Sequence, residues 1–77
     1  MDEADKIKFI KVIGHRVKYF RNKIGFSQEK LALEADVEIS QISRIERGVI
    51  NTSIVQMAVI AKALEIPLYR LFQSDSF

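Results

Sequence analysis

Polar side chains of the segment 39–47 fall on one face of a short helix, opposite two isoleucines. Ile42 and Ile45 lie three residues apart, the spacing of a helix face that is buried against a core. The opposite face then carries Ile39, Ser40, Gln41 and Arg44. Arginine donates two hydrogen bonds to guanine, glutamine binds adenine, and an apolar side chain contacts the methyl group of thymine. This face therefore has the chemistry to read base edges in DNA, although a solvent-exposed polar face would have the same composition.

Catalytic and metal-binding chemistry finds little support in the sequence. His15 is the only histidine and there is no cysteine, so no histidine or thiolate ligand set is available for a metal. His15 has no nucleophile at a recognised motif spacing. The glycines, Gly14, Gly25 and Gly48, are too far apart to form a phosphate-binding loop. We expect no enzyme activity, no cofactor, no metal and no small-molecule ligand.

Hydrophobic residues that recur every three or four positions predict the helices that position this face. The first helix covers about residues 5–23, ends before Gly25, and turns inward Ile7, Ile10, Ile13, Val17, Phe20 and Ile24. The second covers about residues 28–35 behind Ser27, whose hydroxyl is a good N-cap. Asp36 forms the turn, because aspartate tolerates the left-handed conformation better than most residues. The third helix, about residues 39–47, ends at Gly48.

Two further helices complete the predicted fold. Ser53 caps a fourth helix, residues 54–64, whose inner face carries Met57, Ala58, Ala61 and Leu64. Pro67 begins a last short helix that carries Leu68, Leu71 and Phe72, and residues 73–77 form a frayed tail. No strand-like alternation occurs anywhere in the chain. The predicted fold class is all-α, a compact five-helix bundle that contains a helix-turn-helix.

Length and composition are those of one small globular domain. The chain has 77 residues, of which 48% are hydrophobic and 29% charged. We expect a single domain with a core at about residues 5–72, an acidic N-terminal tail and a short C-terminal tail. The acidic start and the lysines that interrupt the following apolar residues exclude a secretory signal and a membrane span. We therefore expect a cytoplasmic protein with no membrane partner.

Positive charge is concentrated in the first helix, although the net charge is only +2. No acidic residue interrupts the basic set Lys6, Lys8, Lys11, Arg16, Lys18, Arg21 and Lys23. Asp2, Glu3 and Asp5 precede it, where negative charge at a helix N-terminus is favoured. The basic run is either a solvated helix face or a surface that binds nucleic acid.

Several fragments resemble the helix-turn-helix family of the lambda repressor and Cro, often called the XRE family. They are FSQEKLA at 26–32, ISRIERG at 42–48 and AKAL at 61–64, in the family's order and spacing. The resemblance covers about residues 13–72. It implies a lambda-repressor-like fold and sequence-specific binding of double-stranded DNA by a small transcriptional regulator of the repressor or controller type. The helix at 39–47 would enter the major groove.

The resemblance also implies roles for individual residues. Ile39, Ser40, Gln41 and Arg44 match positions from which family members reach base edges. Gln28 would bond to a phosphate and brace the recognition helix, and Ser43 and Arg47 would contact phosphates. Glu46 would pair with Arg21 and clamp the third helix to the first, the alternative being a solvated surface pair.

The sequence departs from the family pattern at a few positions. Asp36 and Glu65 occupy places where glycine is common, Glu38 replaces the usual Ser or Thr cap, and Thr52 replaces a frequent proline. Glutamate caps a helix less well than serine or threonine. These differences affect the exact helix ends and the DNA affinity rather than the fold.

The C-terminal half offers more apolar residues than one small core needs. They include Val55, Val59, Leu68, Tyr69 and Phe72. A homodimer through this surface explains the surplus most simply, and it would place two recognition helices on a palindromic operator. The alternative is a protein-interaction module, such as an antitoxin or adaptor, that binds a partner protein through the same bundle.

Overall fold

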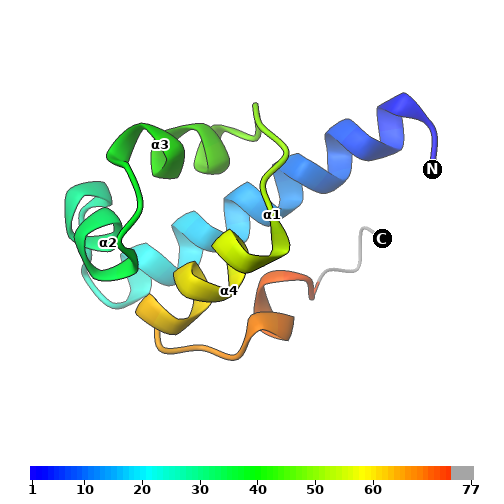
Figure 1. The fold of residues 1–77 in the computed structure, drawn as a ribbon. Coiled ribbons are helices and arrows are strands. Elements are labelled where there is room, and N and C mark those ends of the chain that lie inside the picture. The colour runs from blue at the N-terminus through cyan, green and yellow to red at the C-terminus, as the bar shows by residue number, and fades with distance from the viewer. Residues whose placement is uncertain (74–77) are drawn as a thin grey trace.

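Four α-helices and one 3₁₀ turn make up residues 1–73, which are the residues described in the computed structural model. The elements are α1 (Glu3–Lys23), α2 (Gln28–Ala35), α3 (Ile39–Arg47), α4 (Ile54–Ala63) and η1 (Leu68–Leu71). In Figure 1, α1 runs the length of the molecule, with α3 on one side and α4 and η1 on the other. The helix α2 closes the end at which α1 finishes. The all-α prediction is thus confirmed for this part of the chain.

Most helix ends follow the local signals of the sequence. The Ser27 hydroxyl accepts a hydrogen bond from the Lys30 amide, and the Ser53 hydroxyl accepts one from Gln56, both at 3.0 Å. Asp36 adopts the left-handed conformation after α2, with φ 55°, as predicted. The predicted bounds of α2 and α3 are confirmed, whereas α4 ends one residue early, at Ala63.

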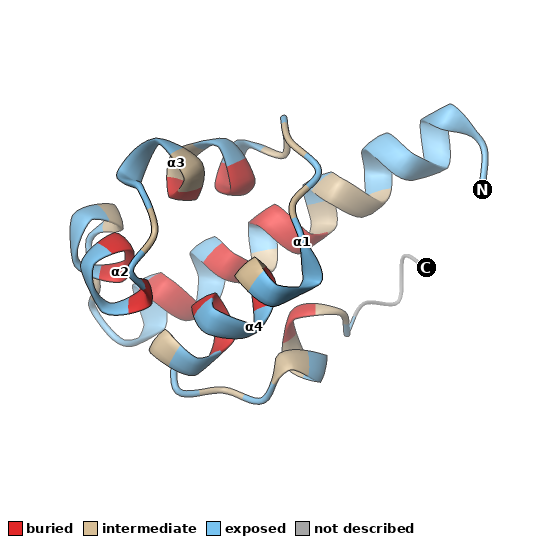
Figure 2. Cartoon of the chain, viewed as in Figure 1, coloured by how far each residue is buried: buried red, intermediate tan, exposed pale blue. Residues whose placement is uncertain are grey.

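The start of α1 differs from the prediction. The helix begins at Glu3 rather than near residue 5, because the Asp2 carboxylate accepts a hydrogen bond from the Asp5 amide at 2.8 Å and caps the first turn. Glu3, expected to lie in the acidic tail, is therefore helical, and Asp2 is the N-cap of α1. Figure 2 shows that these first turns are exposed and extend beyond the rest of the molecule.

The hydrophobic core lies between α1, α2, α3, α4 and η1. Its buried apolar residues are Ile13, Val17, Phe20, Leu31, Ala32, Ala35, Ile42, Ile45, Met57, Ile60, Ala61, Leu64 and Leu71. Two predictions for α1 were wrong, since Ile7 and Ile24 are exposed. In α4, Ala58 is exposed, so its predicted inward orientation was wrong, and Ile60, which was not among the predicted inner residues, is fully buried.

The expected fifth α-helix is instead the single 3₁₀ turn η1. The amide of Arg70 bonds to the carbonyl of Pro67, and that of Phe72 to the carbonyl of Tyr69, which is a spacing of three residues. Leu71 is fully buried, so the segment still closes the core. The predicted frayed tail includes residues 74–77, which lie outside the described residues. Within residues 1–73, no helix has the length and apolarity that a membrane span requires.

Candidate nucleic-acid interface

The helix α3 rests directly on the main chain of α1. A Cβ atom added at Gly14 would come within 2.1 Å of the Ile45 carbonyl oxygen and 3.1 Å of that of Glu46. The main chains of the two helices can approach this closely because residue 14 has no side chain. The glycine thereby fixes the depth at which α3 lies on α1.

A buried ion pair holds the same two helices together. The Arg21 guanidinium donates hydrogen bonds to both carboxylate oxygens of Glu46, from Nε at 2.6 Å and from Nη2 at 2.9 Å. The Arg21 side chain is 10% exposed and that of Glu46 is 3% exposed. Hydrogen bonding to Glu46 raises the pKa of Arg21 above its ordinary value, and the charge of Glu46 adds to this, against the lowering effect of burial. Arg21 therefore remains charged in the folded protein.

Three more groups contribute hydrogen bonds around this pair, one of which is the Asn22 side chain, whose Oδ1 accepts from Arg21 Nη1 at 3.2 Å. Arg21 Nη1 donates to the carbonyl of Phe26 at 2.8 Å, which ties α1 to the segment before α2. Gln28, in the first turn of α2, donates from Nε2 to Glu46 Oε1 at 3.1 Å. A single carboxylate on α3 is thus bound from both α1 and α2. This contact of Gln28 with Glu46 was not among the sequence predictions.

The outer face of α3 takes no part in the core. Ile42 and Ile45 face inward and are almost fully buried, whereas Ile39, Ser40, Arg44 and Arg47 are exposed and Gln41 and Ser43 are half-buried. Neither Arg44 nor Arg47 makes an ion pair or a side-chain hydrogen bond with any residue in 1–73. The fold therefore brings the residues of α3 that are predicted to contact DNA onto one surface, and the arginines among them have their charged groups available.

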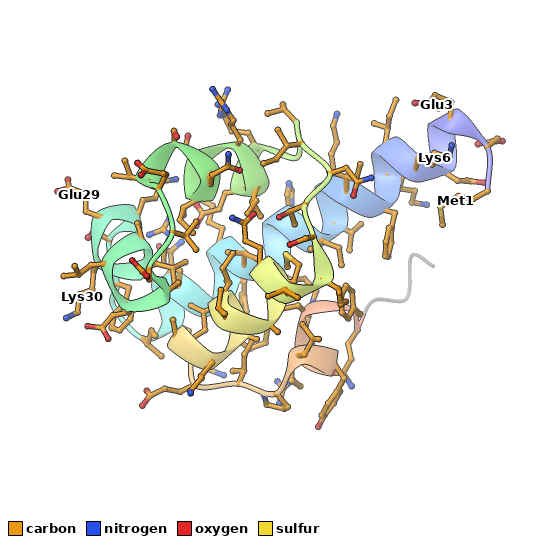
Figure 3. The ribbon with its side chains drawn as sticks, in the orientation of Figure 1. Met1, Glu3, Lys6, Glu29 and Lys30 are labelled. Atoms are coloured by element: carbon orange, nitrogen blue, oxygen red, sulfur yellow. The ribbon has the colours of Figure 1, made fainter. Side chains whose placement is uncertain are left out.

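The start of α3 lacks a side-chain cap. Glu38 occupies the N-cap position but its carboxylate accepts no hydrogen bond from the first turn, as expected for glutamate. Acidic residues also lie on the exposed side of α2, where Lys30 pairs with Glu34 at 2.8 Å. Figure 3 shows Glu29 and Lys30 on the outside of α2, at the opposite end of the molecule from Glu3 and Lys6. Glu29, Asp36 and Glu38 line one surface hollow together with Ile39, so negative charge borders the start of α3.

The predicted dimer residues divide into two groups. Val55, Val59 and Tyr69 are exposed, with 69%, 38% and 60% of their surface accessible. Leu68 and Phe72 are half-buried against the chain's own core, and Phe72 stacks on Phe9 with ring centres 6.4 Å apart. The exposed members of the set thus lie on α4, except for Tyr69, which lies on η1.

Two further positioning contacts, besides that of Gln28 with Glu46, were missed by the sequence reasoning. The Arg16 Nε donates to the carbonyl of Arg70 at 2.7 Å and holds η1 on α1, and no sequence signal predicts such a bond. Gly14 had a signal, because a glycine inside a helix costs about 1 kcal/mol relative to alanine. A glycine in the interior of a helix therefore indicates a position that another main chain approaches closely.

Comparison with known proteins places this geometry in context. The helix-turn-helix family model matches residues 17–71. The HTH-type transcriptional regulator SlrR of Bacillus subtilis (strain 168) is 35% identical over 66 residues, which cover 84% of this chain and 43% of SlrR. Control protein C.BamHI of Bacillus amyloliquefaciens is 43% identical over 56 residues, covering 71% of this chain and 69% of that protein.

A solved structure shows the same similarity in three dimensions. The restriction-modification controller protein C.AhdI from Aeromonas hydrophila matches with a TM-score of 0.80 at 35% identity, covering 82% of this chain and 96% of that chain. The chain thus spans less than half of SlrR but nearly the whole of a small controller protein.

Proposed function

Because the chain belongs to the helix-turn-helix family, we propose that it is a transcriptional regulator that binds specific sequences of double-stranded DNA through α3. The observation that carries the proposal is the two-sided construction of α3. Its inner face is fixed by Ile42, Ile45 and the Arg21–Glu46 pair, and its outer face is exposed and polar. A rigid helix with unpartnered polar groups on one side is what reading a major groove requires.

Each outer residue has a role that its chemistry supports. Arg44 reads guanine through two hydrogen bonds, Gln41 binds adenine, and Ile39 contacts a thymine methyl group. Ser40 reaches a base or a phosphate. The residues that hold phosphates are Gln28, Ser43 and Arg47. Gln28 has two amide hydrogens, so it can donate to Glu46 and to a phosphate at the same time.

The similarity to two controller proteins supports a more specific role. C.BamHI is named a control protein and C.AhdI a restriction-modification controller protein, and both are covered over two thirds or more of their length. We propose that this chain is likewise a small regulator of the controller type. Its occupancy of DNA would then follow its own concentration.

We propose further that two copies act together on a palindromic site. Val55 and Val59 lie one turn apart on α4 and are exposed, as is Ile54 beside them. Pairing through this face would bury apolar surface and place two copies of α3 about 34 Å apart, on successive major grooves. The alternative is that a different protein docks on this face, as in an antitoxin or adaptor.

Selection of bound sequences from a random duplex pool tests the DNA-binding proposal. Wild-type protein is expected to enrich a defined site, and Arg44→Ala to lose preference at one base pair at a cost of about 1–3 kcal/mol on the preferred site. Arg47→Ala is the matched control, because losing a phosphate contact weakens all sequences alike. If wild-type protein enriched no sequence, the role assigned to α3 would be rejected. If Arg44→Ala weakened binding to every sequence equally, the role assigned to Arg44 would be rejected.

A further inference from the structure

The basic residues of α1 separate into two groups in the folded protein. One group has partners within the chain. Lys6 lies 4.0 Å from Glu3, Arg16 bonds to the Arg70 carbonyl, Arg21 pairs with Glu46, and Lys23 lies over the ring of Tyr19 at 5.8 Å. The charge of these residues is already used in holding the fold or is paired locally.

The second group has no such partner. Lys8, Lys11, His15 and Lys18 are exposed and make no ion pair or side-chain hydrogen bond with another residue of 1–73. Their spacing of three, four and three residues places them along one line of the helix surface. From Lys8 to Lys18 this line is about 15 Å long at 1.5 Å per residue. We call these four residues the basic stripe.

The basic stripe runs beside α3. Lys11 lies against the end of α3, because a Cβ atom at Gly48 would be 2.7 Å from its Cγ. One turn further toward the N-terminus, Lys8 lies beyond that end. Figure 1 shows the first turns of α1 continuing past α3 at the same level of the molecule. DNA that receives α3 in its groove would therefore pass close to this part of α1.

We propose that the basic stripe, chiefly Lys8 and Lys11, binds phosphates of the DNA backbone that flank the groove entered by α3. The inference rests on the proposed function and extends the interface from α3 to α1. Lysine suits this role, since its ammonium is a point charge on a long flexible stem that contacts phosphate without reading sequence. None of the acidic residues at the start of the chain interrupts the stripe, because Asp2, Glu3 and Asp5 precede Lys8.

The salt dependence of DNA binding tests the proposal. The test variant is Lys8→Gln with Lys11→Gln, and the matched control is Lys6→Gln with Lys23→Gln, which removes the same charge from the same helix away from the stripe. Each phosphate contact contributes about 0.9 to the slope of log K against log salt. The test variant is expected to lower the slope by about 1.8, so that its affinity deficit shrinks on the order of tenfold between about 50 and 200 mM salt. The control is expected to keep the wild-type slope.

A second measurement uses the length of the duplex. Removing base pairs outside the segment bound by α3 should weaken wild-type binding and leave the test variant nearly unaffected. Equal slopes for the test and control variants, or equal sensitivity to trimming, would overturn the proposal. These outcomes differ from a failure of the proposed function. If the proposed function failed, the wild-type protein would show no preferred DNA site at all. Circular dichroism of both variants establishes that helix content is unchanged.

Discussion

Replacing Glu46 by glutamine keeps the size of the side chain but removes the charge that neutralises Arg21. Both partners are largely buried, with side chains 3% and 10% exposed, so water cannot replace the lost carboxylate. Two charge-assisted hydrogen bonds, at 2.6 and 2.9 Å, are affected. Breaking a buried pair by removing one partner costs about 3–5 kcal/mol. Because the amide still offers one acceptor oxygen, we expect a loss near the lower end, about 3 kcal/mol.

Thermal and urea unfolding followed by circular dichroism measure this loss. In a domain of this size, about 3 kcal/mol corresponds to a fall in Tm of roughly 12–24 °C. The control is Glu34→Gln, which breaks the exposed pair with Lys30 and should cost less than about 1 kcal/mol. A change of pH cannot remove the charge of Arg21, because its raised pKa keeps the guanidinium protonated even in alkaline solution. Only a mutation therefore removes the positive partner of the pair.

A double-mutant cycle decides whether the two residues act as a unit. Arg21→Met and Glu46→Leu each leave one buried charge unpaired, whereas the double variant leaves none. The combined loss should therefore be smaller than the sum of the single losses by about 2 kcal/mol. Additive losses, or a Glu46→Gln variant no less stable than Glu34→Gln, would refute the reasoning.

The remaining predictions concern the contact beneath α3 and the apolar surface of α4. Gly14→Ala should destabilise the fold, because the new Cβ meets a main-chain carbonyl that cannot rotate away. The overpacking costs about 1–3 kcal/mol, and a gain of about 1 kcal/mol in helix propensity offsets part of this cost. It should weaken DNA binding even below its unfolding temperature, and unchanged affinity would show that α3 is positioned without this contact. Val59→Glu should retain its helix content yet sediment as a monomer and lose affinity for a palindromic site far more than for a half-site. Leu33→Glu, at an exposed apolar residue of α2, is its control. A wild-type protein that stays monomeric both free and on DNA would contradict the dimer, and a stable complex with a different protein would favour the adaptor.

Local signals were sufficient for much of the fold. The caps at Ser27 and Ser53 and the left-handed turns at Asp36 and Gly48 act within a few residues, so the sequence alone locates them. Periodicity indicates which face of a helix is apolar, but not how far its neighbours extend. Ile7 was therefore predicted to be buried although α1 extends past its neighbours at its start, and Ile24 was predicted to be buried although it is the exposed C-cap at the other end of α1.

Other features depend on tertiary contacts that no local signal records. The helix α4 is apolar on nearly every side, so its pattern could not choose between Ile60 and Ala58 for the core. Pro67 correctly marked the start of η1, but the hydrophobic pattern after it could not distinguish a 3₁₀ turn, whose hydrogen bonds span three residues, from an α-helix. The residues of the outer face of α3 could be identified from spacing and resemblance. The bond from Gln28 to Glu46 could not, because the resemblance assigned the Gln28 amide to a phosphate and no spacing in the sequence pairs these two residues.

The construction of α3 separates the residues that hold the helix from the residues that face outward. Gly14, Glu46 and the two buried isoleucines act from beneath, while Ile39, Ser40 and Arg44 contribute almost nothing to the core. Exchanging outer residues therefore changes what the helix recognises without changing its position on α1. A library randomised at these positions should yield folded proteins with different target sequences.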